Sequence, residues 1–141
     1  MRMLALPAAI AMLALSASAS FAGTNQDLAQ ARISSIAAGD LRAVASGYAG
    51  SATLHWVGGP LDGTYSKPAA IKAIWTKFFH AQGNQAATIA STSEAASPKG
   101  STVTTDVTFA GKSTVKDRYV LVSRDGKVTE EIWQVNPPAS Y

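Results

Sequence analysis

Cysteine is absent from the 141-residue chain, and only 15% of its residues are charged. Without thiols the protein cannot form a disulfide, a zinc–thiolate site or a cysteine nucleophile. All three methionines, at positions 1, 3 and 12, lie near the N-terminus, so the rest of the chain contains no sulfur. A domain of this composition must be held together by its hydrophobic core alone.

The first 22 residues have the pattern of a secretory signal peptide. Arg2 supplies the positive start, residues 4–15 form an apolar run, and Ser20-Phe21-Ala22 provides the small residues read by a signal peptidase. The apolar run is shorter than the ~20 residues of a membrane-spanning helix. We therefore expect cleavage after Ala22, export to the periplasm or the medium, and one domain over residues 23–141.

Charge in the remaining chain is nearly balanced, with eleven basic and nine acidic residues once Arg2 is removed. The basic residues are scattered and form no stripe with interleaved aromatic residues, so a nucleic-acid partner is not expected. No later stretch is apolar enough for a membrane anchor. Neither His55 nor His80 has a second histidine at ligand spacing, so we expect neither a metal site nor a cofactor.

Helical patterns dominate the first part of this domain. Apolar residues at helical spacing predict a helix over 24–39, broken by Gly39, and a short second helix capped by Asp40 that includes Tyr48. A third helix is predicted up to Gly83, with Ser66 as its cap and Pro68 in its first turn. One strand, residues 52–57, and a loop at 61–65 lie between the second and third helices.

The second part of the domain is predicted to be β structure. Residues 101–109, 112–123 and 127–135 are strands, the last two joined by the Arg124-Asp125-Gly126 hairpin signal. Residues 85–97, rich in Ala, Ser and Thr, fit either a loop or a fourth late strand. Strands grouped after helices predict an α+β fold with an antiparallel sheet.

Three stretches of the chain, taken together and in sequence order, resemble a known protein family. Residues 36–41 run into 48–49 and 52–54; residues 59–65 lead into 70–71, Trp75 and 78–79; residues 125–128 precede Glu131 and Trp133. Together they resemble the nuclear transport factor 2-like superfamily, in its SnoaL-like (polyketide-cyclase-like) branch. The resemblance implies a cone-shaped fold, in which a curved antiparallel sheet wraps three helices and encloses a pocket, and a homodimer formed through the outer sheet face.

The resemblance does not imply one chemistry. Matched on residues 48–49 and 52–53, the general base of steroid-isomerase members falls on Trp56, whose indole cannot accept a proton from carbon. Their helix-one tyrosine falls on Arg32 and their sheet aspartate near Tyr119. Epoxide hydrolases of the superfamily use an Asp-Arg-Asp set, and adjacent Asp117 and Arg118 must point to opposite faces of a strand. We therefore recognise no complete catalytic set.

A pocket wall is predicted instead from the inward positions of the family. Residues 54/56, 119/121 and 131/133 each share strand parity, and Trp75 and Phe79 share a helix face. An aromatic wall of this kind suits a small organic ligand of unknown identity. The predicted wall consists of Tyr48, Leu54, Trp56, Trp75, Phe79, Tyr119, Leu121, Glu131 and Trp133.

Glu131 and Asp106 are the candidate acid/base residues. A buried Glu131 would be a general acid/base, but Glu130-Glu131 also fits a solvated pair, and the face to which Asp106 points stays open. The first hypothesis is thus an exported, small-molecule-binding domain without catalysis. The alternatives are a cofactor-independent lyase, isomerase or hydrolase using Glu131 or Asp106 with Tyr48 or Tyr119, and a purely structural assembly domain.

Overall fold

The structure, a computed structural model, describes residues 21–136. The predicted leader lies outside the described residues except for Phe21 and Ala22, which begin the first helix, and Pro137-Pro138 also lies outside them. None of the helices within residues 21–136 has the length and hydropathy of a membrane-spanning segment.

Three helices are present: α1 (Phe21–Ala38), α2 (Leu41–Ser46) and α3 (Pro68–Gln82). Gly39, with a φ of 68°, ends α1, and the Asp40 side chain accepts a 3.0 Å hydrogen bond from the Ala43 N–H to cap α2. Both features were predicted. The predicted cap of α3 is wrong, because Ser66 pairs with Thr53 in a strand and Lys67 precedes Pro68 without a side-chain cap.

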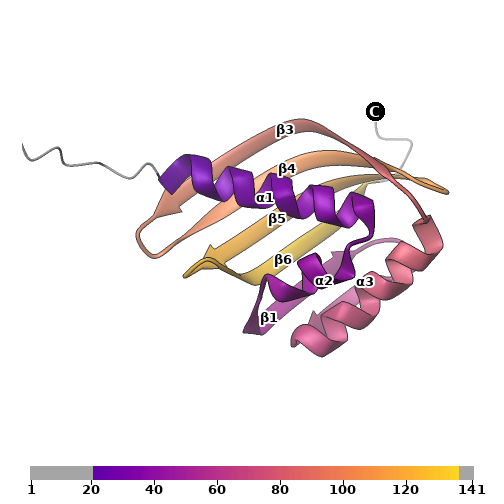
Figure 1. The fold of residues 1–141 in the computed structure, drawn as a ribbon, viewed down its shortest axis with the longest axis horizontal. Coiled ribbons are helices and arrows are strands. Elements are labelled where there is room, and N and C mark those ends of the chain that lie inside the picture. Colours follow the sequence, from indigo (N-terminus) through magenta and orange to yellow (C-terminus); the bar gives the residue numbers. More distant parts are fainter. Residues whose placement is uncertain (1–20, 137–141) are drawn as a thin grey trace, which may run out of the picture.

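Six strands form one sheet in the order β2-β1-β6-β5-β4-β3 (Figure 1). Neighbouring strands are antiparallel except for β1 and β6, which run parallel; β6 lies between β1 and β5. The strands are β1 (Tyr48–Val57), β2 (Gly63–Ser66), β3 (Ala86–Ser97), β4 (Gly100–Ala110), β5 (Thr114–Arg124) and β6 (Lys127–Asn136).

The α+β class and the curved sheet are confirmed, with differences at three elements. Residues 63–66, predicted as part of a loop, form β2; residues 86–97, which fitted a loop or a strand, form the edge strand β3. Tyr48, predicted at the end of the second helix, is the first residue of β1. The strand geometry directs this tyrosine into the interior, where its side chain is buried.

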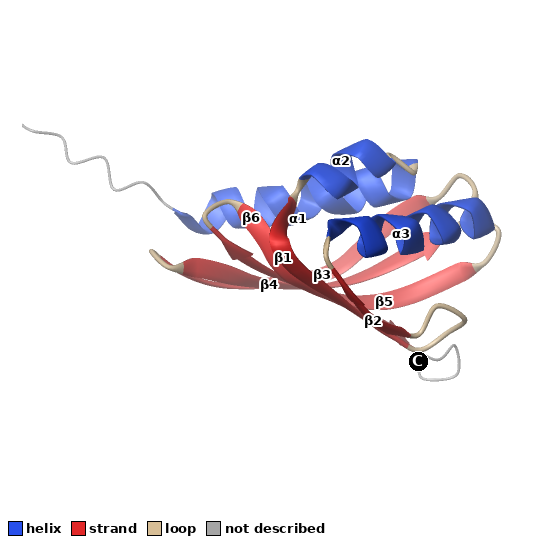
Figure 2. Cartoon of the chain, turned by 90° about the horizontal axis from the view of Figure 1, so that it is seen from below, coloured by secondary structure: helices blue, strands red, loops and turns tan. Residues whose placement is uncertain are grey.

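All three helices cover the same face of the sheet, and the opposite face carries no helix from residues 21–136 (Figure 2). Alternate residues of β4 and β5 are buried under the helices, as expected for a sheet with one covered face. On β5, Asp117, Tyr119 and Leu121 point inward, whereas Arg118 is exposed. The core therefore lies between the helices and the inner sheet face.

Candidate functional site

The residues predicted to form the pocket wall come together in the core. Only Phe79 is partly exposed; the others are buried. Trp133 lies 5.1 Å from Trp56 and 5.0 Å from Trp75 between ring centroids, and Tyr119 packs edge-on against it at 5.4 Å. These aromatic rings thus pack directly against one another at the centre of the fold.

Glu131 is fully buried and lies at the centre of a hydrogen-bond network, so it is not one of a solvated pair. Its Oε2 accepts a 2.9 Å hydrogen bond from Arg32 Nε and one from the Tyr119 hydroxyl, and its Oε1 accepts one from the Tyr48 hydroxyl. Trp75 Nε1 donates to the Tyr48 oxygen at 2.6 Å. We call these five residues the Glu131 cluster.

Charge in the Glu131 cluster is balanced by one buried ion pair between Arg32 and Glu131. Burial alone would lower the pKa of Arg32, but the Glu131 carboxylate raises it above its usual value. Burial, reinforced by the nearby Glu131 charge, raises the pKa of Tyr48, and burial also raises that of Tyr119 despite the adjacent Arg32. Both tyrosines therefore remain hydrogen-bond donors at neutral pH.

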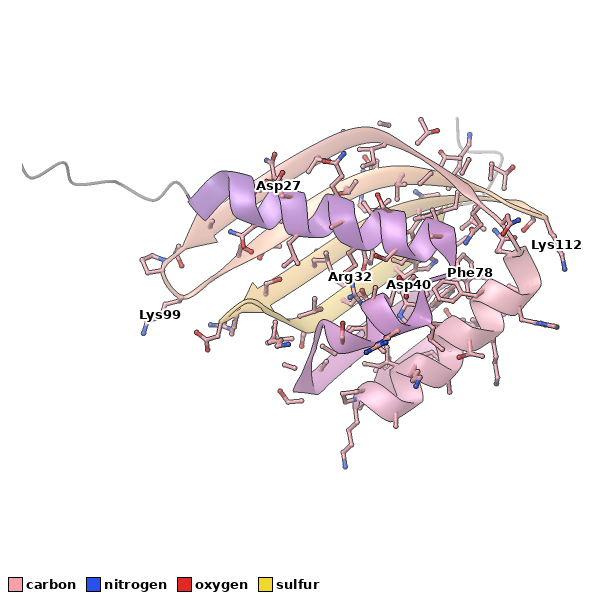
Figure 3. The ribbon with its side chains drawn as sticks, in the orientation of Figure 1. Asp27, Arg32, Asp40, Phe78, Lys99 and Lys112 are labelled. Carbon is pink, nitrogen blue, oxygen red and sulfur yellow. The ribbon has the colours of Figure 1, made fainter. Side chains whose placement is uncertain are left out.

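Sequence reasoning did not select Arg32 as a site residue. It lies three residues after Ala29 and four before Ile36, both buried on the inner face of α1, so helical spacing already places it toward the core. Arg32 Nη1 also donates to the Val44 carbonyl at 2.9 Å, and the guanidinium lies 4.4 Å from the Tyr48 ring centroid. Its side chain is buried, and in Figure 3 it is seen between α1 and α2.

Asp106, the second acid/base candidate, points away from the core. It forms a 2.9 Å ion pair with the Arg118 side chain and accepts a hydrogen bond from Ser91 at 3.1 Å. The hydrogen bonds from Arg118 lower the pKa of Asp106. Glu131 and Asp106 therefore lie on opposite faces of the sheet and do not form one acid/base site.

Asp117, on the inner face of β5, is a buried aspartate. It is 1% exposed, and neither carboxyl oxygen has a hydrogen-bond partner in the part of the chain that the structure describes. Burial, with smaller contributions from the charges of Glu131 and Asp106, raises the pKa of Asp117 to about 9. The group is therefore a neutral carboxylic acid at pH 7.

An apolar cavity of about 200 Å³ lies between the C-terminal half of α3, the β1–β2 loop and the start of β5; we call it the α3 cavity. Of the nine predicted wall residues, only Trp56 lines it. Phe78 faces it from α3 and extends inward in Figure 3. Its lining consists of Trp56, Gly59, Pro60, Leu61, Lys77, Phe78, Ala81, Gln82, Ser113, Val115 and Val135.

The loop that forms one lip of the α3 cavity is held by its own hydrogen bonds. The Tyr65 hydroxyl donates to the Leu61 carbonyl at 2.7 Å, and Asp62 accepts from the Gly58 N–H at 2.7 Å. Gly58 and Gly59 have φ values of 86° and 75°, which side chains disfavour. The lip is therefore a defined turn rather than a loose connection.

Several solved structures have the same architecture as this chain. A nuclear transport factor 2-like protein of unknown function from Pseudomonas putida KT2440 aligns with a TM-score of 0.73 at 14% identity, over 87% of this chain and 92% of its own. The chain has the nuclear transport factor 2-like fold. No protein-family model and no curated protein matches the sequence.

Two further structures share this nuclear transport factor 2-like fold. A protein from Burkholderia xenovorans LB400, also of unknown function, aligns with a TM-score of 0.61 at 16% identity, over 82% of this chain and 85% of its own. A Sinorhizobium meliloti protein named "putative polyketide cyclase" aligns with a TM-score of 0.58 at 16% identity, over 77% and 94%.

Neither histidine belongs to the Glu131 cluster or lines the α3 cavity. His55 lies on the outer face of β1, and His80 is exposed near the end of α3. Within residues 21–136, no three His, Asp or Glu side chains gather as a metal site would require.

Proposed function

We propose that the protein is exported and that its domain binds a small apolar organic molecule in the α3 cavity. The observation that carries this proposal is the cavity itself: about 200 Å³ walled by hydrocarbon and aromatic side chains, among them Trp56, Leu61 and Phe78. Small-molecule sites are concave and mostly apolar, and drug-sized ligands occupy ~300–1,000 Å³. The ligand is therefore smaller than a typical drug.

The Glu131 cluster supports binding without catalysis rather than acid/base chemistry. A general base needs a free lone pair within reach of the substrate. Both Glu131 oxygens already accept hydrogen bonds from protein groups, and the side chain is fully buried. In this proposal the cluster stabilises the packing of the helices on the sheet. Asp106 is paired with Arg118 and lies on the outer surface.

The uncovered sheet face supports the proposal that a second copy packs there. Val120 and Ile132 lie opposite each other on β5 and β6, both only half-buried, on the face that carries no helix (Figure 2). His55 is the neighbour of Ile132 on β1. An apolar centre with polar surroundings is typical of a homodimer interface.

The test of ligand binding uses two tryptophan substitutions on α3. Ala81 is exposed and lines the cavity, whereas Ala73 is exposed and does not. Ala81→Trp fills the cavity, and Ala73→Trp adds the same side chain elsewhere on the helix. We expect toluene to raise the unfolding temperature of the processed wild-type protein and of Ala73→Trp, but not that of Ala81→Trp.

Native mass spectrometry of the same three proteins, purified from the cells that export them, identifies the natural ligand. We expect a retained small-molecule mass on wild type and Ala73→Trp and its absence from Ala81→Trp. No stabilisation by toluene and no retained mass in any of the three would refute the proposal, as would equal behaviour of the two variants.

A further inference from the structure

We propose that the ligand of the α3 cavity is a small monocarboxylic acid whose carboxylate pairs with Lys77 at the cavity mouth. This inference rests on the proposed function and specifies its ligand class. It follows from the distribution of charge and of hydrogen-bonding capacity around an otherwise apolar cavity.

Among the described residues, Lys77 is the one charged side chain that lines the cavity. It is exposed, and within residues 21–136 it forms no ion pair. A lysine commonly lays its hydrocarbon stem along apolar surface and keeps its ammonium in water. In the proposed site the stem forms part of the wall, and the ammonium at the mouth pairs with the ligand carboxylate.

A second cation, Lys112, lies next to the lining residue Gln82. The Lys112 N–H donates to the Gln82 carbonyl at 2.9 Å, and Lys112 Cε lies 3.6 Å from where a side chain on Gly83 would begin. Figure 3 shows Lys112 at this end of the molecule, beyond the end of α3. Among residues 21–136 the lining includes Lys77 and no aspartate or glutamate, which favours an anionic ligand group.

Gln82 and Ser113, the amide and hydroxyl side chains of the lining, are hydrogen-bonded to each other. Gln82 Oε1 accepts from the Ser113 N–H at 3.1 Å and from the Ser113 hydroxyl at 2.8 Å. Gln82 Nε2 donates to the Ser113 carbonyl at 3.0 Å and to Gln85 at 3.3 Å. Both amide protons are therefore used, and within residues 21–136 Lys77 is the lining side chain that carries a positive charge.

The carboxylate of Asp62, next to the lining residue Leu61, forms no ion pair with Lys77 in the described part of the chain. Its Oδ1 accepts the Gly58 N–H at 2.7 Å within the β1–β2 turn. The inner wall, formed by Trp56, Phe78 and Val115, offers no charge for a second acidic group. Burying such a group unpaired would be costly, so the ligand carries one acidic group at one end.

The experiment compares 3-phenylpropanoate with 3-phenylpropanamide, which has nearly the same shape without the charge. Dissociation constants are measured by calorimetry with the processed wild-type protein, Lys77→Met and Lys72→Met. Lys72 is exposed on the same helix and does not line the cavity, so its variant is the matched control.

We expect wild type and Lys72→Met to bind the acid about two- to fivefold more tightly than the amide, as for an ion pair at an exposed lysine. Lys77→Met should bind both compounds with the affinity of the amide. The preference for the acid should also weaken as salt rises from 0.05 to 0.5 M.

Two outcomes overturn the inference in distinguishable ways. Equal binding of acid and amide by wild type, unchanged in Lys77→Met, refutes the carboxylate and leaves the apolar site intact. Binding of neither compound, together with no effect of toluene, refutes the α3 cavity as a ligand site.

Discussion

Of the described aspartates, Asp117 has the environment least favourable to a charged carboxylate. It points inward between Val115 and Tyr119 on β5, and its carboxyl group has no hydrogen-bond partner within residues 21–136. A buried carboxyl group without a partner stays protonated, because only the charged form must give up strong hydration. Folding therefore holds a proton on Asp117 that the unfolded chain releases near pH 4.

This proton makes stability depend on pH. Between about pH 4 and the folded-state pKa of about 9, the native state binds one proton more at Asp117 than the unfolded state does. Stability from this group is therefore highest below pH 4 and falls as pH rises, by up to about 1.4 kcal/mol per pH unit. We expect Asp117→Asn to lose this slope in urea unfolding series from pH 5 to 9.

The control for this prediction is Asp106→Asn. Asp106 is an outer-face aspartate whose pKa is lowered, so its removal should leave the wild-type slope in place. If Asp117→Asn and Asp106→Asn show the same pH dependence as wild type, Asp117 is not the group that releases the proton.

At the scale of elements, the Arg32–Glu131 pair joins α1 to β6 through the core. Removing one member of a buried ion pair leaves an uncompensated charge and commonly costs ~3–5 kcal/mol. We expect Glu131→Gln and Arg32→Met each to lower the free energy of unfolding by about that amount. The double variant should be more stable than the sum of the two losses predicts, as a urea-unfolding double-mutant cycle would show.

The exposed pair provides the comparison for this cycle. Arg118 and Asp106 have a similar N–O distance of 2.9 Å but lie at the surface, where such pairs contribute ~0–1 kcal/mol. Arg118→Met should therefore change stability by less than about 1 kcal/mol. A Glu131→Gln loss no larger than the Arg118→Met loss would contradict the structural role of the cluster.

Much of the element order could be predicted from the sequence, because it depends on local patterns. Gly39, Asp40, Pro68 and Gly83 mark helix ends through backbone conformation and capping, and those marks hold. The short strand β2 was not predicted, since its four residues carry no alternation of their own and depend on pairing with β1. The parallel β1–β6 pair also depends on contacts between distant parts of the chain.

In the candidate site, too, local patterns predict some features, and others depend on contacts between distant parts of the chain. Alternation correctly places Tyr119 and Glu131 on the inner face of their strands. It cannot reveal that Arg32, from a helix far away in sequence, supplies the partner of Glu131. Nor can it tell a cavity from packed rings: Trp75 and Trp133 contact each other, and only Trp56 of the predicted wall reaches the α3 cavity.

For the whole molecule, the testable property is association through the outer sheet face. A charge placed at Ile132 would be buried unpaired in the proposed dimer but solvated in a monomer. We expect wild type to elute as a dimer in size-exclusion chromatography with light scattering, and Ile132→Asp as a folded monomer. Thr76→Asp, exposed on α3, should remain dimeric. A monomeric wild type would contradict this interface.

The central position of β6 also has a consequence for when the protein folds. The C-terminal strand of residues 21–136 lies in the middle of the sheet, where Leu54 of β1 pairs with Glu131. Until that strand has been synthesised, the β1–β2 hairpin and the β3–β5 meander have no strand to join them. Because the central strand is made last among these elements and closing such distant pairs is slow, we expect the nascent chain to stay unfolded through most of its synthesis. A translocation channel accepts an unfolded chain, and this topology keeps it available for the export proposed above.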